Sequence, residues 1–181
     1  MPEFLANWLF AFTEWLRTTW MNDFAIWLSN TRFSLFFSEH WYMIPGLQTI
    51  HIISIAMGFV SVLMISFRIL GFSGKSLTVN RTVERYLPWI WWALGGLVFS
   101  GAFLVISEPI RDLVNPIFWP KMVGVLTVFA VSLWFARTAW LSTGKWETGE
   151  TSSGVRVAAF CIILLWLFVI LCGRWIAYAP V

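Results

Sequence analysis

Charged side chains are scarce in this chain of 181 residues. They make up 12% of the sequence, whereas a soluble domain carries about 25%. Because 59% of the residues are hydrophobic, there is too little polar surface to cover a water-soluble particle. The net charge is +3, and the basic residues do not form a block of the kind that binds nucleic acid. We therefore expect a membrane protein whose main partner is the lipid bilayer.

Cysteine and histidine are also scarce. Cys161 and Cys172 lie in one apolar segment, and on a helix they would be about 16 Å apart, too far for a disulfide. The chain has no Cys-x-x-Cys pair, which argues against a c-type haem and a thiolate zinc site. It also lacks a phosphate loop and a metal-binding His pair on one helical turn. The N-terminus lacks the pattern of a signal peptide, so we expect Met1 to be retained.

Long apolar segments dominate the remaining sequence. Each of four segments can cross about 30 Å of hydrocarbon as a helix. They run from Pro45 to Leu70, Pro88 to Ser107, Phe118 to Trp140 and Val155 to Tyr178. We expect Pro45, Pro88 and Pro120 to lie in first helical turns, where the missing N–H has no consequence. The sequence thus predicts an all-α fold, with a four-helix transmembrane bundle over residues 45–181.

The first 44 residues have a different pattern. Glu3, Asn7 and Glu14 recur at helical spacing among aromatic residues, which is typical of an amphipathic helix lying in the membrane interface. The stretch from Asn22 to Phe37 is polar in its middle, and we interpret it as interfacial or re-entrant. The 14 tryptophans fit a belt at the membrane surface. Residues 1–44 are therefore predicted to form interfacial or re-entrant helices ahead of the bundle.

Basic residues are concentrated in two of the connections. The first connection carries Arg68, Lys75, Arg81 and Arg85, and the third carries Arg137, Lys145 and Arg156. Six of the nine acidic residues belong to the other side of the predicted bundle. By the positive-inside rule, the sequence predicts a multi-pass protein of a bacterial inner membrane with both termini in the periplasm.

His51 is the histidine that lies inside a predicted span. Ser54, Gly58 and Ser61 follow it on the same side of the helix, and small residues at this spacing let a neighbouring helix approach closely. We therefore expect His51 to face the bundle. An ionisable side chain inside a membrane is a candidate functional residue.

Three further charged residues fall near the same end of the predicted bundle. They are Glu108, Lys121 and Arg174. In one interpretation His51 is the axial iron ligand of haem b, Lys121 and Arg174 pair with the propionates, and glycines 95, 96 and 101 leave room for the macrocycle. In the other, His51 and a cation bind the head group of a quinone. Either would make the protein a membrane subunit of an electron-transfer system.

Several simpler interpretations stay open. His51 can hydrogen-bond a neighbouring helix, Lys121 and Arg174 can extend to the headgroups, and the glycines can serve packing. Glu39, His40 and Glu108 are a further candidate set for copper or zinc. His40 and His51 are too far apart along one helix to share an iron, but a homo-oligomer can pair two copies of His51. The alternative function is a cofactor-free structural or assembly subunit of a larger membrane complex.

Several short motifs resemble a family of small bacterial inner-membrane proteins known as a domain of unknown function. The motifs are His51, Arg68-Ile69-Leu70-Gly71, Gly101, Phe118 to Lys121, Gly173-Arg174 and Tyr178. In that family an acidic residue often precedes the end of the first long helix, where this chain has Ser66 and Phe67. The resemblance covers nearly the whole chain. It implies four helices in a bacterial membrane and assigns no activity.

Overall fold

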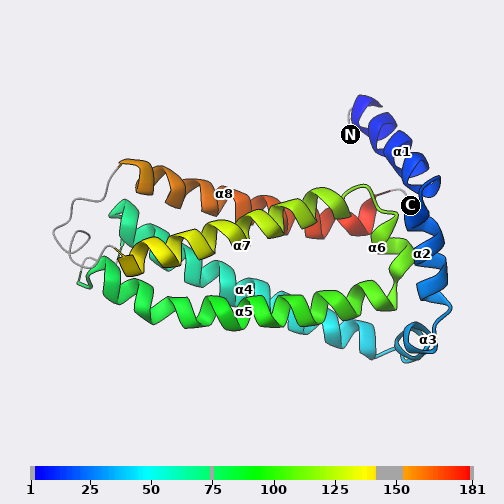
Figure 1. Cartoon of the computed structure of the whole chain (residues 1–181), viewed down its shortest axis with the longest axis horizontal. Helices are drawn as coiled ribbons and strands as arrows, with labels where there is room; N and C mark the ends of the chain where they lie inside the picture. Colours follow the sequence, from blue (N-terminus) through cyan, green and yellow to red (C-terminus); the bar gives the residue numbers. More distant parts are fainter. Residues whose placement is uncertain (1–2, 74–75, 142–152, 180–181) are drawn as a thin grey trace. The chain divides into compact units, whose positions relative to one another are not determined.

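A computed structural model describes residues 3–73, 76–141 and 153–179. Within these ranges the regular structure is helical throughout, which confirms the all-α fold (Figure 1). The helices are α1 (Glu3–Arg17), α2 (Trp20–Ser29), α3 (Arg32–Glu39), α4 (Met43–Leu70), α5 (Val79–Ser107), α6 (Pro109–Leu113), α7 (Phe118–Leu141) and α8 (Ser153–Trp175), and the 3-10 helix η1 (Ile176–Tyr178) follows α8.

Within the described residues, three stretches are long and apolar enough to cross a membrane. They are α4, α5, and α8 together with η1. Helix α7 begins at Phe118, as expected, and its apolar part within the described residues, Phe118–Ser132, is shorter than a full span. The structure therefore supports a membrane protein with several spanning helices, and the crossing by α7 stays a prediction.

The position of Pro88 differs from the sequence-based expectation. Helix α5 begins at Val79, so Pro88 lies inside the helix and not in its first turn. The hydroxyl oxygen of Thr78 accepts a hydrogen bond from the backbone N–H of Arg81 at 3.3 Å, and this caps the helix before its apolar part begins. The error arose because the polar first turns of α5 do not look like a membrane span. Pro45 and Pro120 do lie in first turns, as predicted.

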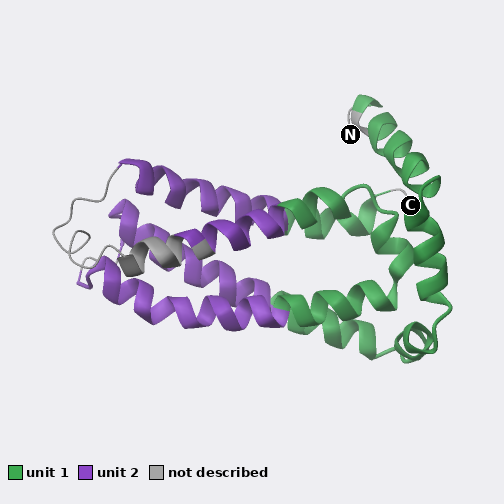
Figure 2. Ribbon diagram, in the orientation of Figure 1, with its two compact units in different colours: residues 1–52, 97–123, 170–181 green, residues 53–96, 124–169 purple. Residues whose placement is uncertain are grey.

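The chain divides into two compact units (Figure 2). Unit 2 consists of residues 53–96 and 124–169, which include segments of α4, α5, α7 and α8. Small residues bring these segments together. A Cβ atom at Gly58 would lie 2.9 Å from the ring of Trp166 and 3.2 Å from Ala93, and one at Gly124 would lie 2.8 Å from Val169. Close approach at small residues, predicted for the Gly58 side of α4, is therefore present in this unit.

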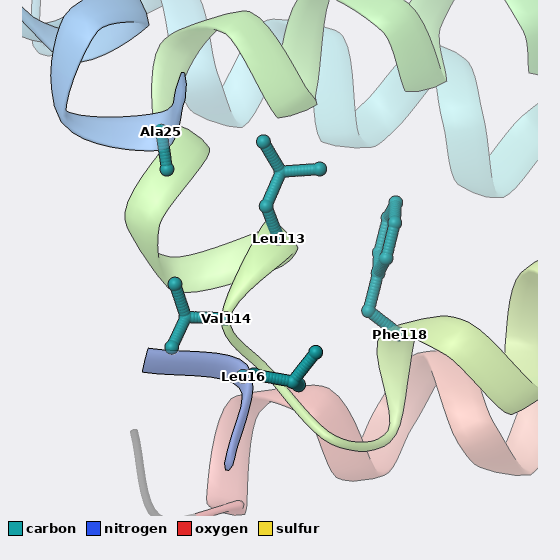
Figure 3. Close-up of a cluster of buried hydrophobic side chains, with 5 residues drawn as sticks. All are labelled: Leu16, Ala25, Leu113, Val114 and Phe118. Atoms are coloured by element: carbon teal, nitrogen blue, oxygen red, sulfur yellow. The ribbon is translucent and has the colours of Figure 1, made fainter. Parts of the chain in front are cut away.

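Unit 1 consists of residues 1–52, 97–123 and 170–181, and includes α1, α2, α3 and α6. Helix α2 packs on α6. Beside this contact lies a buried apolar cluster made of Leu16, Ala25, Leu113, Val114 and Phe118 (Figure 3). The Asn115 amide, fully buried, donates a hydrogen bond to the Ile176 carbonyl at 3.0 Å, which joins the start of α7 to the end of the third spanning stretch. The short helix α6 and the turn after it are thus held by contacts with segments that precede and follow them in the sequence.

The N-terminal helices of unit 1 have one packed and one exposed face. On α2, Ala25 is buried, whereas Trp20, Phe24 and Trp27 are exposed, and the ring of Phe24 contacts both tryptophan rings. This pattern fits the predicted amphipathic, interfacial character of residues 1–44. The stretch from Asn22 to Phe37 is divided between α2 and α3. The proposed boundary at residue 44 stays a prediction.

Candidate functional site

His51 contacts helix α5 within unit 1. Its Nδ1 atom lies 2.8 Å from the hydroxyl oxygen of Ser100, a side chain that is fully buried. A Cβ atom at Gly101 would lie 3.5 Å from the Cε1 atom of the imidazole, so α5 presents bare backbone to the ring. The Nε2 atom makes no hydrogen bond with the described part of the chain. The imidazole is therefore held through one nitrogen while the other remains available.

Lys121 lies in the first turn of α7 and is partly buried. Its Nζ atom is 3.9 Å from the point where a Cβ atom of Gly173 would stand, so the end of the lysine side chain lies beside α8 at this glycine. The ammonium interacts electrostatically with His51, Asp112 and Cys172. Among residues 3–73, 76–141 and 153–179 it has no hydrogen-bond or ion-pair partner.

Asp112 is the site residue that the sequence analysis did not single out. It lies in α6 and is partly buried. Burial raises the pKa of its carboxyl group, the charge of Lys121 acts in the opposite direction, and Glu108 adds to the rise. The carboxylate forms no hydrogen bond or ion pair with the residues that the structure describes. The available signal was Pro109, which marks a helix start and so places Asp112 one turn later.

Glu108 and Arg174 are engaged elsewhere. The carboxylate of Glu108 accepts a hydrogen bond from Arg111 at 2.6 Å in a partly exposed ion pair. Arg174 is exposed; its guanidinium donates to the Tyr178 hydroxyl at 2.9 Å and lies over the same ring. Of the four predicted site residues, His51 and Lys121 interact electrostatically with each other. Glu108 interacts electrostatically with Asp112. The roles of all four predicted residues in cofactor binding stay predictions.

The glycines of α5 do not form an open space. A Cβ atom at Gly96 would overlap the hydroxyl of Ser54, and Gly101 is covered by His51. Gly95 is exposed and has nothing beside it. No group of three or more His, Cys, Asp or Glu residues that could hold a metal ion occurs in the part of the chain described. His40 is at the exposed end of α3, with its Nδ1 atom 2.7 Å from the carbonyl oxygen of Phe36.

The comparison with known families covers most of the chain. Residues 37–179 match a family described as "Family of unknown function (DUF6644)". The comparisons with curated proteins and with solved structures returned no match. The matched region includes His51, Asp112 and Lys121, whereas α1 and α2 precede it. The expected resemblance to an uncharacterised family is confirmed, and the chain belongs to the Family of unknown function (DUF6644).

Proposed function

We propose that this protein is a quinone-reactive membrane subunit of an electron-transfer system, in which His51 and Lys121 hold the quinone head group. The observation that carries this proposal is the ammonium of Lys121. It is partly buried at the start of an apolar helix and has no acceptor among the described residues. A cation in this position is unfavourable without a partner, so a ligand that supplies an acceptor oxygen would stabilise it.

A quinone matches the donors that the site offers. Its two carbonyl oxygens accept hydrogen bonds, and its ring is apolar. The Lys121 ammonium can donate to one oxygen, and the free Nε2 position of His51 can donate to the other when it carries the proton. Because Asp112 interacts electrostatically with Lys121 but forms no salt bridge with it, the ammonium keeps its hydrogen bonds for a ligand oxygen.

Haem b fits the same residues less well. Its two propionates call for two cations, but Arg174 is exposed and bonded to Tyr178. The space expected beside Gly96 and Gly101 is taken by Ser54 and His51. Haem b is therefore the less favoured cofactor, and the experiment below distinguishes it from a quinone.

The proposed function also requires a redox partner and a defined orientation of the site in the membrane. A quinone must exchange electrons with a second protein, which agrees with membership of a larger membrane complex. The Lys/Arg bias of the connections supports a bacterial inner membrane with both termini in the periplasm. The site would then lie toward the periplasmic face.

A cofactor-free structural subunit is the second candidate function. The His51–Ser100 hydrogen bond favours it, because this bond satisfies one nitrogen of the imidazole without a ligand.

The proposal is tested by isolating the protein gently with its native lipid. Organic extraction followed by mass spectrometry is expected to yield a quinone in proportion to the protein. Absorption spectra of the oxidised and dithionite-reduced protein are expected to show no haem band. The Lys121→Met variant should lose the extractable quinone, whereas His40→Ala should retain it. A haem band would favour haem b, and a colourless preparation without quinone would favour the structural subunit.

A further inference from the structure

An apolar groove of about 450 Å³ lies between α4 and α5 within unit 2. Residues of α4 from Ile53 to Ser61 form one wall, which is about 12 Å long on a helix. Tyr86 and Trp89 of α5 form the other wall. The Ser61 hydroxyl donates a hydrogen bond to the Met57 carbonyl at 2.7 Å, so the α4 wall is satisfied without a ligand. The groove therefore suits an apolar chain.

Two arginines lie beside the α5 wall of this groove. The guanidinium carbon of Arg85 is 5.9 Å from the centre of the Tyr86 ring. Arg81 precedes Arg85 by four residues and Trp89 follows it by four, so the three share one row on the surface of α5. Both arginines are exposed, and neither guanidinium forms an ion pair or a hydrogen bond with a described residue. The apolar groove thus has a positively charged end.

Tyr86 and Trp89 join the apolar and the charged parts. Each ring is apolar, whereas the tyrosine hydroxyl and the indole N–H are donors that bond to no residue in the described part of the chain. Rings of this kind lie where hydrocarbon meets polar headgroups. Glu84 lies between the two arginines in the sequence, and the described ion pairs do not include it. The arginines therefore keep their charge for a ligand.

We propose that this groove binds one anionic phospholipid. An acyl chain lies against α4, the phosphate lies at Arg81 and Arg85, and the ester oxygens accept from Tyr86 and Trp89. Basic residues at the end of a membrane helix attract anionic headgroups, and the groove adds a place for the chain that follows the headgroup. A second copy of the protein fits less well, because a two-fold axis at this groove would bring like charges together.

Native mass spectrometry of the full-length protein tests this inference. The protein is mixed in detergent with equal amounts of phosphatidylglycerol and phosphatidylcholine that carry the same acyl chains. The wild type should retain one phosphatidylglycerol molecule in preference to phosphatidylcholine. Replacing Arg81 and Arg85 by Gln should lower this preference by about fivefold for each arginine. Arg156→Gln, which removes an exposed cation of α8, is the matched control and should keep the preference.

A second variant tests the groove itself. Ala56 belongs to the α4 wall and is exposed, so Ala56→Phe should fill the groove and reduce retention of both lipids. An excess of glycerol phosphate, which has a phosphate headgroup and no acyl chain, should not displace the lipid. Thermal melting shows whether each variant is folded. If the arginine variants do not fold, Ala56→Phe decides.

Several results would overturn the lipid site. They are equal retention of the two lipids by the wild type, an unchanged preference in the folded arginine variants, and unchanged retention in Ala56→Phe. Displacement by glycerol phosphate would show that the groove does not contribute. A lipid-free dimer that Ala56→Phe dissociates would assign the groove to a second copy. None of these results depends on whether the protein binds a quinone.

Discussion

The Nδ1 atom of His51 and the hydroxyl oxygen of Ser100 lie 2.8 Å apart and join α4 to α5. The Ser100 side chain is fully buried, so removal of the imidazole would leave a polar group without this partner. Loss of a hydrogen bond of this kind reduces stability by about 0.5–1.5 kcal/mol, and the packing of the ring against α5 is lost with it. His51→Ala should therefore lower the unfolding temperature in detergent.

His40→Ala is the matched control for this prediction. His40 lies at the end of α3 and its ring bonds to an exposed part of the backbone, so its loss should change stability by only about 0.5 kcal/mol. Thermal melting of both variants at one detergent concentration shows which of them loses more stability. Equal small losses would show that His51 is not held by α5.

Gly96 and Gly95 are neighbours with opposite surroundings. A methyl group at Gly96 would overlap the Ser54 hydroxyl, whereas nothing lies within 4 Å of a methyl group at Gly95. Gly96→Ala should therefore destabilise the protein by about 1–3 kcal/mol, and Gly95→Ala should be neutral or slightly stabilising because alanine favours a helix. Chemical or thermal unfolding in detergent measures both.

A second substitution sharpens this prediction. Without the hydroxyl, the nearest atom to the new methyl group at position 96 would be the Ser54 Cβ atom, at 3.3 Å. Ser54→Ala should thus recover most of the stability lost in Gly96→Ala. Additive losses in the double variant would contradict the close approach of α4 and α5 at this point.

Much of the fold could be predicted from local sequence, and part of the site could not. The starts of α4 and α7 follow from Pro45 and Pro120 beside apolar runs, because a helix in lipid must satisfy its own backbone. The start of α5 was misplaced because its first turns are polar and are capped by Thr78.

The missing part of the site depends on distant packing. His51 and Lys121 could be found because a charged or polar side chain in an apolar run is conspicuous. Asp112 could not, because its burial depends on α6 being covered by α2 through Ala25 and Leu113, which are far apart in the sequence. Arg174 was expected to pair with a propionate or to extend to the headgroups, whereas it bonds to Tyr178, four residues later.

Asp112 should make stability depend on pH in an unusual direction. Burial raises the pKa of its carboxyl group in the folded protein, so folding favours the protonated form. The wild type should lose stability as the pH rises from about 3.9, the usual aspartate value, through the raised value. Asp112→Asn removes this loss.

The difference in unfolding temperature between Asp112→Asn and the wild type is the measurement. It should favour Asp112→Asn increasingly as the pH rises through this window, and it should become constant above it. Asp23→Asn, which replaces an exposed carboxylate, serves as the control. A difference that is the same at every pH would show that Asp112 is not buried in the folded protein.

The basic connections predict the orientation in the membrane. Reporter fusions after Val181 should be active in the periplasm, and fusions within residues 74–82 should be active in the cytoplasm, because Lys and Arg are retained on the cytoplasmic side. A cytoplasmic signal after Val181 would reverse the topology and place His51 toward the opposite face.

The central claim is that His51 and Lys121 form a quinone site, and equilibrium dialysis of a short-chain benzoquinone tests it most directly. The account predicts saturable binding to the wild-type protein in nanodiscs. It predicts a loss of affinity of about tenfold or more in Lys121→Met, because a charge-assisted hydrogen bond is removed. Arg174→Gln should bind as the wild type does, since Arg174 is bonded to Tyr178. Binding that does not saturate, or that is equal in the wild type and in Lys121→Met, would contradict the account.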